Sequence, residues 1–200
     1  MLRFLAFFIS FGSQYSWGSY DKSMLETGDI LLQPLSCWSC ELIEKQESSK
    51  YSHIGIVIKK NHEIFVAEAI GRVSLIPLSR FLMRTQKDSK VKVRRLKNLL
   101  ELDKLEVQNV VESLLGSPYD KNFRWDNFDG ELESFYCSEF VYKSLDRTVG
   151  FISLTPKEML YDINPKAWDT YFQKKTPRGE LGISPEDFNK SFEFEDMGYI

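Results

Sequence analysis

The sequence predicts an α+β fold in which helices pack around an antiparallel sheet. Two apolar runs, at 53–59 and 64–69, are separated by the short polar stretch KNHE, a pattern typical of a β-hairpin. Helical patterns at 100–116 and 137–150 follow later in the chain. Because these helices come after a run of strands and do not alternate with them, the order favours antiparallel strands with segregated helices.

Five strands and two short helices are expected in the first half of the chain. The strands cover 28–33, 53–59, 64–69, 72–78 and 91–96, and the helices cover 39–47 and 77–84. In the last strand, Val91 and Val93 alternate with Lys92 and Arg94, a pattern typical of a strand with one face in water. We therefore interpret this locally basic stretch as a solvated face rather than a phosphate site.

The two longest helices, 100–116 and 137–150, are expected on either side of a long loop. The inward residues of the first should be Leu102, Leu105, Val110, Leu114 and Leu115, and those of the second Phe140, Val141 and Leu145. The loop at 117–134 is aromatic and acidic. Loops of this length in compact domains are often functional.

Two short helices are expected near the end of the chain. At 155–160 and at 184–188, a Ser or Thr is followed by Pro and, three positions after the cap, by an acidic residue. This is the pattern of a capped helix start. The final aromatic and acidic stretch, 192–200, is expected to form either a packed arm or a loose tail.

The first 18 residues have the pattern of a cleaved secretory signal. Arg3 precedes the apolar run Phe4–Phe11, and a small-x-small site ends at Gly18. That run is too short to span a bilayer, and no other segment is long enough to do so. We therefore divide the chain into a signal peptide, 1–18, and one domain, 19–200, and expect a periplasmic or secreted protein. The alternative is an N-terminal helix packed on the core.

Charge and cysteine content limit the possible partners. The net charge of −3 gives no general attraction to nucleic acid. Cys37 and Cys40 form a CxxC pair, but a zinc site would need two more soft ligands nearby. A thioredoxin-like site would need a strand–helix context that this stretch meets only in part. We interpret the pair as structural cysteines or a disulfide, with redox use as the alternative, and expect no metal or cofactor.

Cys137 stands apart from that pair, at the start of a predicted helix. A helix N-terminus carries positive partial charge and free N–H donors, which stabilise a thiolate. The same donors can bind an oxyanion that forms when the thiolate attacks a carbonyl. This position therefore predicts a nucleophile, the alternative being a small apolar core residue.

A partner for this thiol is expected from the predicted hairpin. His53 begins one strand and Glu68 lies near the end of the return strand, so antiparallel pairing should place them side by side. A carboxylate facing an imidazole fixes its tautomer and favours its charged form. Carboxylate, imidazole and thiolate would then form one catalytic chain. The alternative for His53 is a buried histidine bonded to backbone.

Five stretches in order resemble one known family: TGDILLQ, YSHIGIV, FVAEAIG, GSPYD and YCSEFVYKSL. They are similar to the YiiX/YebB-like branch of the NlpC-type papain-like superfamily, which is circularly permuted so that the His strand precedes the Cys helix. The match runs from about Gly28 to Leu145. It implies a permuted papain-like fold with Cys137 as nucleophile, His53 as general base and Glu68 as the third polar residue.

Two further residues follow from the same stretches. Tyr119, in GSPYD, matches a tyrosine that the family places beside the nucleophile, where its phenol would contact the base or the substrate carbonyl. The alternative is an aromatic side chain that packs under the loop. Gln33, at the end of TGDILLQ, is a candidate for a hydrogen bond into the site.

The resemblance implies acyl transfer through a thioester. For an exported enzyme of the NlpC type, the expected substrate is an amide bond in cell-wall peptides, such as peptidoglycan fragments. One alternative is a lipid amidase, thioesterase or acyltransferase of the lecithin retinol acyltransferase-like type, with an acyl pocket lined by the aromatic loop at 123–128. The other is a non-catalytic module that binds wall fragments.

Overall fold

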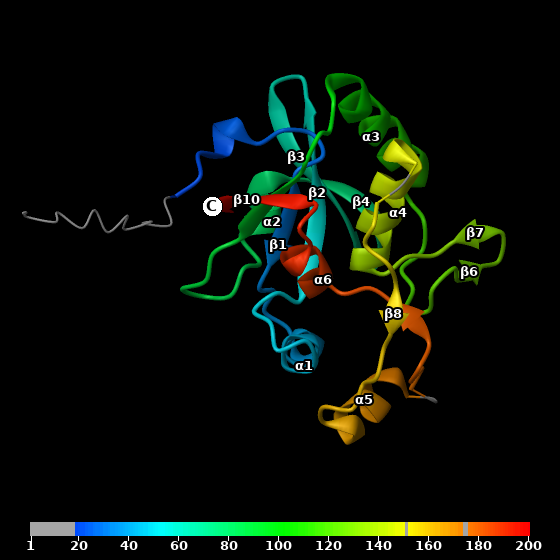
Figure 1. Cartoon of the computed structure of the whole chain (residues 1–200). Coiled ribbons are helices and arrows are strands. Elements are labelled where there is room, and N and C mark those ends of the chain that lie inside the picture. Colours follow the sequence, from blue (N-terminus) through cyan, green and yellow to red (C-terminus); the bar gives the residue numbers. More distant parts are fainter. Residues whose placement is uncertain (1–18, 151, 174–175) are drawn as a thin grey trace, which may run out of the picture.

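A six-stranded antiparallel sheet forms the centre of the computed structural model, which describes residues 19–150, 152–173 and 176–200 (Figure 1). Its strand order is β10-β5-β1-β2-β3-β4. The strands are β1 (Ile30–Gln33), β2 (His53–Lys60), β3 (Glu63–Ile70), β4 (Arg72–Pro77), β5 (Lys92–Leu96) and β10 (Phe194–Tyr199). The predicted signal peptide, 1–18, lies outside the described residues.

Helices cover both faces of this sheet, which confirms the predicted α+β class. They are α1 (Trp38–Gln46), α2 (Leu78–Leu82), α3 (Glu101–Leu114), α4 (Cys137–Val149), α5 (Pro165–Phe172) and α6 (Pro185–Lys190), with a 3-10 turn at Lys22–Met24. Phe81 of α2 packs with Val57 and Val66 on one face, whereas Phe140 of α4 packs with Ile54 on the other. None of the described helices is long and apolar enough to cross a membrane.

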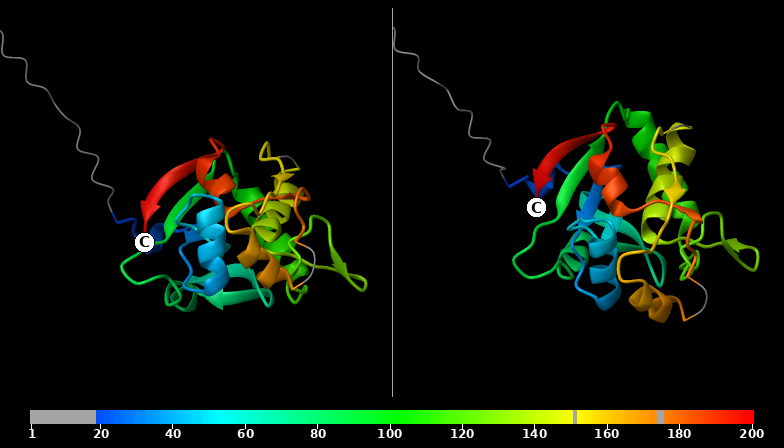
Figure 2. Two further views of the ribbon diagram at one scale, coloured as in Figure 1. Left: turned by 90° about the horizontal axis from the view of Figure 1, so that it is seen from below. Right: turned by 60° about the horizontal axis from the view of Figure 1, so that its bottom comes forward.

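Two small two-stranded sheets lie outside the main sheet. They pair β6 (Phe128–Asp129) with β7 (Leu132–Glu133), and β8 (Lys157–Glu158) with β9 (Leu181–Gly182). Helix α5 lies between β8 and β9 in the sequence, and α6 follows β9. Figure 2 shows α1 in cyan next to α5 in orange and α6 in red-orange, so three helices that are distant in sequence gather on one side.

The prediction of a short helix at 155–160 is wrong. Lys157 and Glu158 form β8 instead, and Met159 exchanges backbone hydrogen bonds with Gly179 and Glu180. Pairing with a distant segment has satisfied the backbone groups that a helical turn would have used. The similar motif at Ser184 does begin a helix, α6, where Ser184 and Asp187 form a capping box.

The inward face predicted for α3 is shifted by part of a turn. Leu102 and Leu105 are 81% and 59% exposed, and the buried residues are Val107, Val111 and Leu114. These three fall at positions i, i+4 and i+7, which is one helical face. By contrast, the predicted inward residues of α4, Phe140, Val141 and Leu145, are fully buried.

The basic face of β5 is covered rather than solvated. The C-terminal stretch adds strand β10 to the sheet, so it is a packed arm. Arg94 donates to the Ser191 and Phe194 carbonyls, and Lys92 pairs with Asp196. The strand predicted at 91–96 is present as β5, but the C-terminal segment covers Lys92 and Arg94.

Two leucine-to-alanine substitutions test this packing. Leu145→Ala should lower the free energy of unfolding by about 2–5 kcal/mol, because it leaves a cavity in the core. Leu102→Ala should change it by less than about 0.5 kcal/mol, because that side chain is exposed. Urea unfolding followed by circular dichroism measures both. Equal losses in the two variants would contradict the placement of α3.

Candidate active site

His53 and Glu68 meet at the start of the β2–β3 hairpin. His53 Nε2 lies 2.7 Å from Glu68 Oε2, and both side chains are at most 3% exposed. Continuing the register of β2 and β3 by one pair places Glu68 opposite Gly55, diagonal to His53 on the same face. A side chain at Gly55 would collide with Val66 and Phe81, so the close packing beside this pair requires glycine. The predicted proximity of His53 and Glu68 is confirmed.

Arg84 binds the same carboxylate, at the same oxygen as His53. Its guanidinium donates to Glu68 Oε2 over 2.6 Å and stacks over the Phe81 ring. Burial alone raises the pKa of Glu68, but its bonds and attraction to His53 and Arg84 bring that pKa below the usual value. Glu68 is therefore a charged carboxylate with two cationic neighbours, and sequence reasoning missed Arg84.

Gln33 lies beside the site but does not point its donor into it. It pairs with His53 across β1 and β2. Its amide nitrogen donates instead to the Phe81 carbonyl, over 2.6 Å, and to Thr85 Oγ1, over 2.9 Å. Both partners flank Arg84 in sequence, so Gln33 fixes the segment that carries the guanidinium.

The Cys137 thiol approaches His53 from the first turn of α4. No side chain caps this helix, because its N-cap is Tyr136, so backbone N–H groups there are free of side-chain partners. His53 and, more weakly, the Ile54 N–H stabilise the charged form of the thiol. Because His53 Nε2 contacts Glu68, Nδ1 is the ring nitrogen left for sulfur.

The electrostatics of Cys137 and His53 favour a negative sulfur and a positive imidazole. Burial alone lowers the pKa of His53, but hydrogen bonds to Cys137 and Glu68, together with their negative charges, raise it to about 9. Burial alone raises the pKa of Cys137, but the hydrogen bond and charge of His53 bring it below the usual value. The two shifts have opposite signs, so each group favours the charged form of the other.

Tyr119 lies near the sulfur, as the resemblance implied. Burial raises the pKa of Tyr119 well above its usual value, and the charge of Cys137 raises it further. The phenol therefore stays protonated. Its hydroxyl is hydrogen-bonded to that of Tyr171 in α5. An isolated bridge between Tyr119 and Phe135 brings the loop alongside the residues that lead into α4.

A small cavity of about 30 Å³ lies beside Cys137. Its wall is almost entirely apolar and comes from α1, α5, α6, the 117–134 loop and the segment around β8 and β9. The large apolar and aromatic side chains in this wall include Phe123, Met159, Tyr161, Trp168 and Ile183. Of the aromatic loop that the sequence suggested as an acyl pocket, Phe123 lines the cavity, whereas Phe128 is exposed.

Ion pairs on the rim of the cavity join three distant elements. Lys157, in β8, bonds Glu47 at the end of α1 over 3.0 Å and Asp187 in α6 over 2.8 Å. Ser184, the N-cap of α6, donates to the same Glu47 carboxylate. These contacts hold α1 and α6 against the β8–β9 strand pair, next to Met159.

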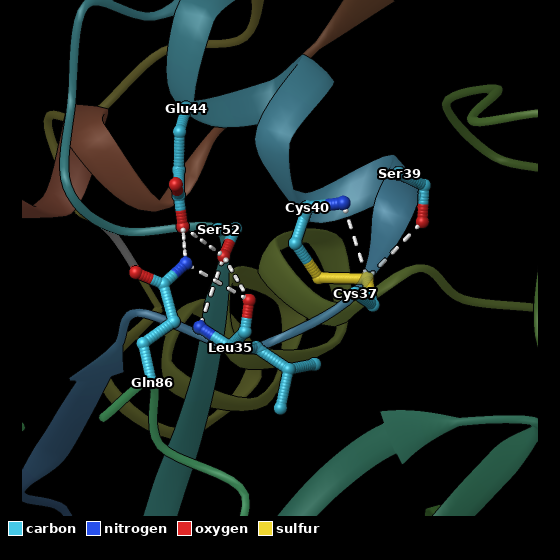
Figure 3. The surroundings of a disulfide bond; sticks show 7 residues. All are labelled: Leu35, Cys37, Ser39, Cys40, Glu44, Ser52 and Gln86. Atoms are coloured by element: carbon cyan, nitrogen blue, oxygen red, sulfur yellow. Dashed lines mark hydrogen bonds between the residues drawn. A yellow bond between two sulfur atoms is a disulfide. The ribbon is translucent and has the colours of Figure 1, made fainter.

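The CxxC pair, Cys37 and Cys40, forms a disulfide at the start of α1 (Figure 3), one of the outcomes left open by the sequence. Cys137 is a free thiol. Farther along α1, the Glu44 carboxylate accepts hydrogen bonds from Ser52 Oγ and Gln86 Nε2, over 2.8 and 2.9 Å. Ser52 immediately precedes the first residue of β2. The network therefore anchors α1 at the strand end where the reactive side chains meet.

The residues that sequence reasoning missed come mainly from α5 and the segment before it. Pro165 at the first helical position follows Asn164, and Trp168 and Phe172 lie four residues apart on one face. This was a readable helix signal. Among the described residues, no three His, Cys, Asp or Glu side chains are grouped so as to hold a metal ion.

Residues 24–195 match the model of a family described as permuted papain-like amidase enzymes, YaeF/YiiX, C92 family. The chain belongs to this family. Membership in the C92 family confirms the predicted YiiX-like branch, the permuted papain-like fold and the cysteine amidase class.

Two relatives of this C92 protein come from Escherichia coli. The uncharacterized protein YiiX of strain K12 is 30% identical over 126 residues, which span 62% of this chain and 59% of that protein. The crystal structure of metalloprotein yiiX from strain O157:H7, DUF1105, matches with a TM-score of 0.76 at 26% identity. That match covers 85% of this chain and 94% of the other.

The rate at which iodoacetamide alkylates Cys137 should report the charged pair. In the wild-type protein, the pH midpoint of this rate should lie below 8.5, the usual thiol value, and reactivity should fall as pH drops through it. His53→Ala should raise the pH midpoint by at least about one unit. Alkylation of Cys137 near neutral pH should then be about tenfold slower. Glu68→Gln and Arg84→Gln should give smaller shifts in the same direction.

Leu102→Ala is the matched control, because it changes an exposed residue remote from the sulfur and should keep the wild-type midpoint. Mass spectrometry of tryptic peptides assigns the modification to Cys137. An unreactive wild-type thiol, or an unchanged midpoint in His53→Ala, would rule out the charged pair and favour the non-catalytic binding module.

Proposed function

We propose that this chain is an exported cysteine amidase that cleaves an amide bond through a thioester on Cys137. The observation that carries the proposal is the buried His53, which lies 2.7 Å from the Glu68 carboxylate and is coupled to Cys137, so that the pKa of the imidazole is raised to about 9. A thiolate that is charged before substrate arrives needs no separate deprotonation step.

Each step uses a residue of the site. The Cys137 sulfur bonds to the amide carbonyl carbon, and the carbon–nitrogen bond then breaks while the His53 imidazolium gives its proton to the leaving amine. Neutral His53 next takes a proton from water, whose oxygen attacks the thioester carbonyl. The carbon–sulfur bond breaks, and the acid leaves with the thiolate and imidazolium restored.

The oxyanion formed in both attacks needs hydrogen-bond donors. Backbone N–H groups in the first turn of α4 are available, since no side chain caps that end of the helix. The protonated Tyr119 phenol becomes a further donor when the oxyanion replaces Tyr171 as its hydrogen-bond partner. Glu68, which lies on the far side of the ring, orients the imidazole and stabilises its positive charge.

The proposed substrate is a cell-wall peptide amide. The secretory pattern of residues 1–18 and the similarity to the NlpC-type superfamily support this assignment. Polar side chains at the edge of the cavity, including Gln46, Glu47 and Ser52, offer hydrogen bonds to a peptide. The apolar wall of the same cavity favours a second candidate, an amide of a fatty acid.

Product analysis separates these two candidates. The protein lacking residues 1–18 is incubated with peptidoglycan fragments and, separately, with fatty-acyl amides, and the products are identified by mass spectrometry. We expect cleavage of one amide bond and, after acid quenching, a Cys137 peptide heavier by the acyl group. Cys137→Ala should reduce turnover by at least about 10³-fold. Turnover that survives in Cys137→Ala would reject the thioester.

Export is tested separately in cells. The full chain with a C-terminal tag should be recovered outside the cytoplasm, with Ser19 as its N-terminal residue by mass spectrometry. Replacing Leu5 and Phe8 with Asp should leave the uncleaved chain in the cytoplasm, because the apolar segment of a signal would be interrupted. An intact N-terminus in wild-type protein would refute cleavage at this site.

A further inference from the structure

The Cys37–Cys40 disulfide takes no part in the proposed amidase reaction and contributes little to holding the fold together. The two cysteines are only three positions apart in the sequence. A disulfide stabilises a protein mainly by restricting the unfolded chain, and this effect is smallest for short loops. Helix α1 has another anchor, because Glu44 accepts hydrogen bonds from Ser52 and Gln86 (Figure 3). The disulfide can therefore open without releasing α1 from the sheet.

The two cysteines differ in how easily a thiol can reach them. Cys37 is exposed, whereas Cys40 is only 3% exposed. Trp38, which follows Cys37, is 56% exposed, and both residues line an open groove of about 820 Å³. A thiol carried by another protein can therefore approach Cys37 while α1 stays folded. Exposed disulfides are the ones that exchange readily with thiols.

The position of Cys37 also favours its thiolate once the disulfide is open. Cys37 is the N-cap of α1, and the Cys40 N–H donates to its sulfur over 3.1 Å. The Ser39 hydroxyl lies 3.3 Å from the same sulfur. A helix N-terminus and nearby donors stabilise a negatively charged sulfur. Cys37 is thus the accessible sulfur of the pair and also a good leaving group.

We propose that Cys37 and Cys40 form a second reactive site, which exchanges reversibly with protein dithiols through the Cys37 sulfur. A thiolate of the dithiol attacks Cys37 Sγ, the Cys37–Cys40 bond breaks, and Cys40 leaves as a thiolate that takes up a proton. The second thiol of the dithiol loses its proton and attacks the partner sulfur bonded to Cys37, so that Cys37 leaves as a thiolate. Two electrons pass to the cysteine pair, and the dithiol becomes a disulfide.

Reduction of the folded protein by a small dithiol tests the proposal. The full chain with Cys137→Ala is used, so that Cys37 and Cys40 are the only cysteines. It is treated with dithiothreitol near neutral pH, quenched with acid and labelled with N-ethylmaleimide, and mass spectrometry counts the labelled cysteines. We expect both to be labelled while the circular dichroism spectrum stays that of the folded protein. Oxidised glutathione should then restore the disulfide.

Single substitutions in the same chain identify the sulfur that is attacked. In Cys40→Ala, oxidised glutathione should form a mixed disulfide on Cys37. In Cys37→Ser, which keeps a capping oxygen for the Cys40 N–H, Cys40 should react at least about tenfold more slowly because it is buried. In Cys40→Ala, the pH midpoint for alkylation of Cys37 should rise when urea unfolds the chain, because the helix N-terminus is lost.

Reduction that requires urea, equal reaction of the two cysteines, or a pH midpoint that urea leaves unchanged would overturn the proposal and leave a purely structural disulfide. None of these results bears on the amidase function, which is judged in chains that keep Cys137. There, the double variant Cys37→Ser/Cys40→Ala should retain the wild-type pH midpoint for alkylation of Cys137, because Glu44 still anchors α1. A shifted midpoint would overturn the separation of the two sites.

Discussion

The buried carboxylate of Glu68 is the constraint on which the site depends. A charge with an exposed fraction of 2% is stable only when it is paired, and Glu68 contacts His53 and Arg84 within 2.7 Å. Neither neighbour alone accounts for the arrangement. His53 is positioned by the hairpin, while Arg84 depends on a turn that Gln33 holds against β1. The orientation of the imidazole is thus determined by three strands and one turn.

The same interaction explains why the pKa of the Cys137 thiol is lowered although the thiol is buried. Burial opposes a thiolate, and it also opposes an imidazolium, so neither charge would persist alone. Together they are stabilised by each other, and Glu68 adds a second negative neighbour to the ring. The free N–H groups of α4 act on sulfur in the same direction. A site of this kind is sensitive to the loss of any one member, because each leaves a buried charge unpaired.

The sequence predicted the parts of the fold that rest on local pattern. The hairpin between His53 and Glu68 follows from alternating apolar residues and a short turn, and α4 follows from its apolar face. Arg84 could not be predicted, because its role depends on a contact with a strand in a different part of the chain. The short helix expected at Lys157 failed for the same reason, since a distant partner, Leu181, competes for that backbone.

The division between predicted and unpredicted residues follows a division in the site itself. The reactive groups lie on the sheet and on α4, where packing of regular elements fixes them. The wall of the cavity lies on short segments, such as β8 and α5, that are joined by ion pairs and aromatic contacts. Such segments can change without disturbing the pairing of His53 with Glu68. The reactive groups and the wall of the cavity therefore depend on separate sets of contacts in this fold.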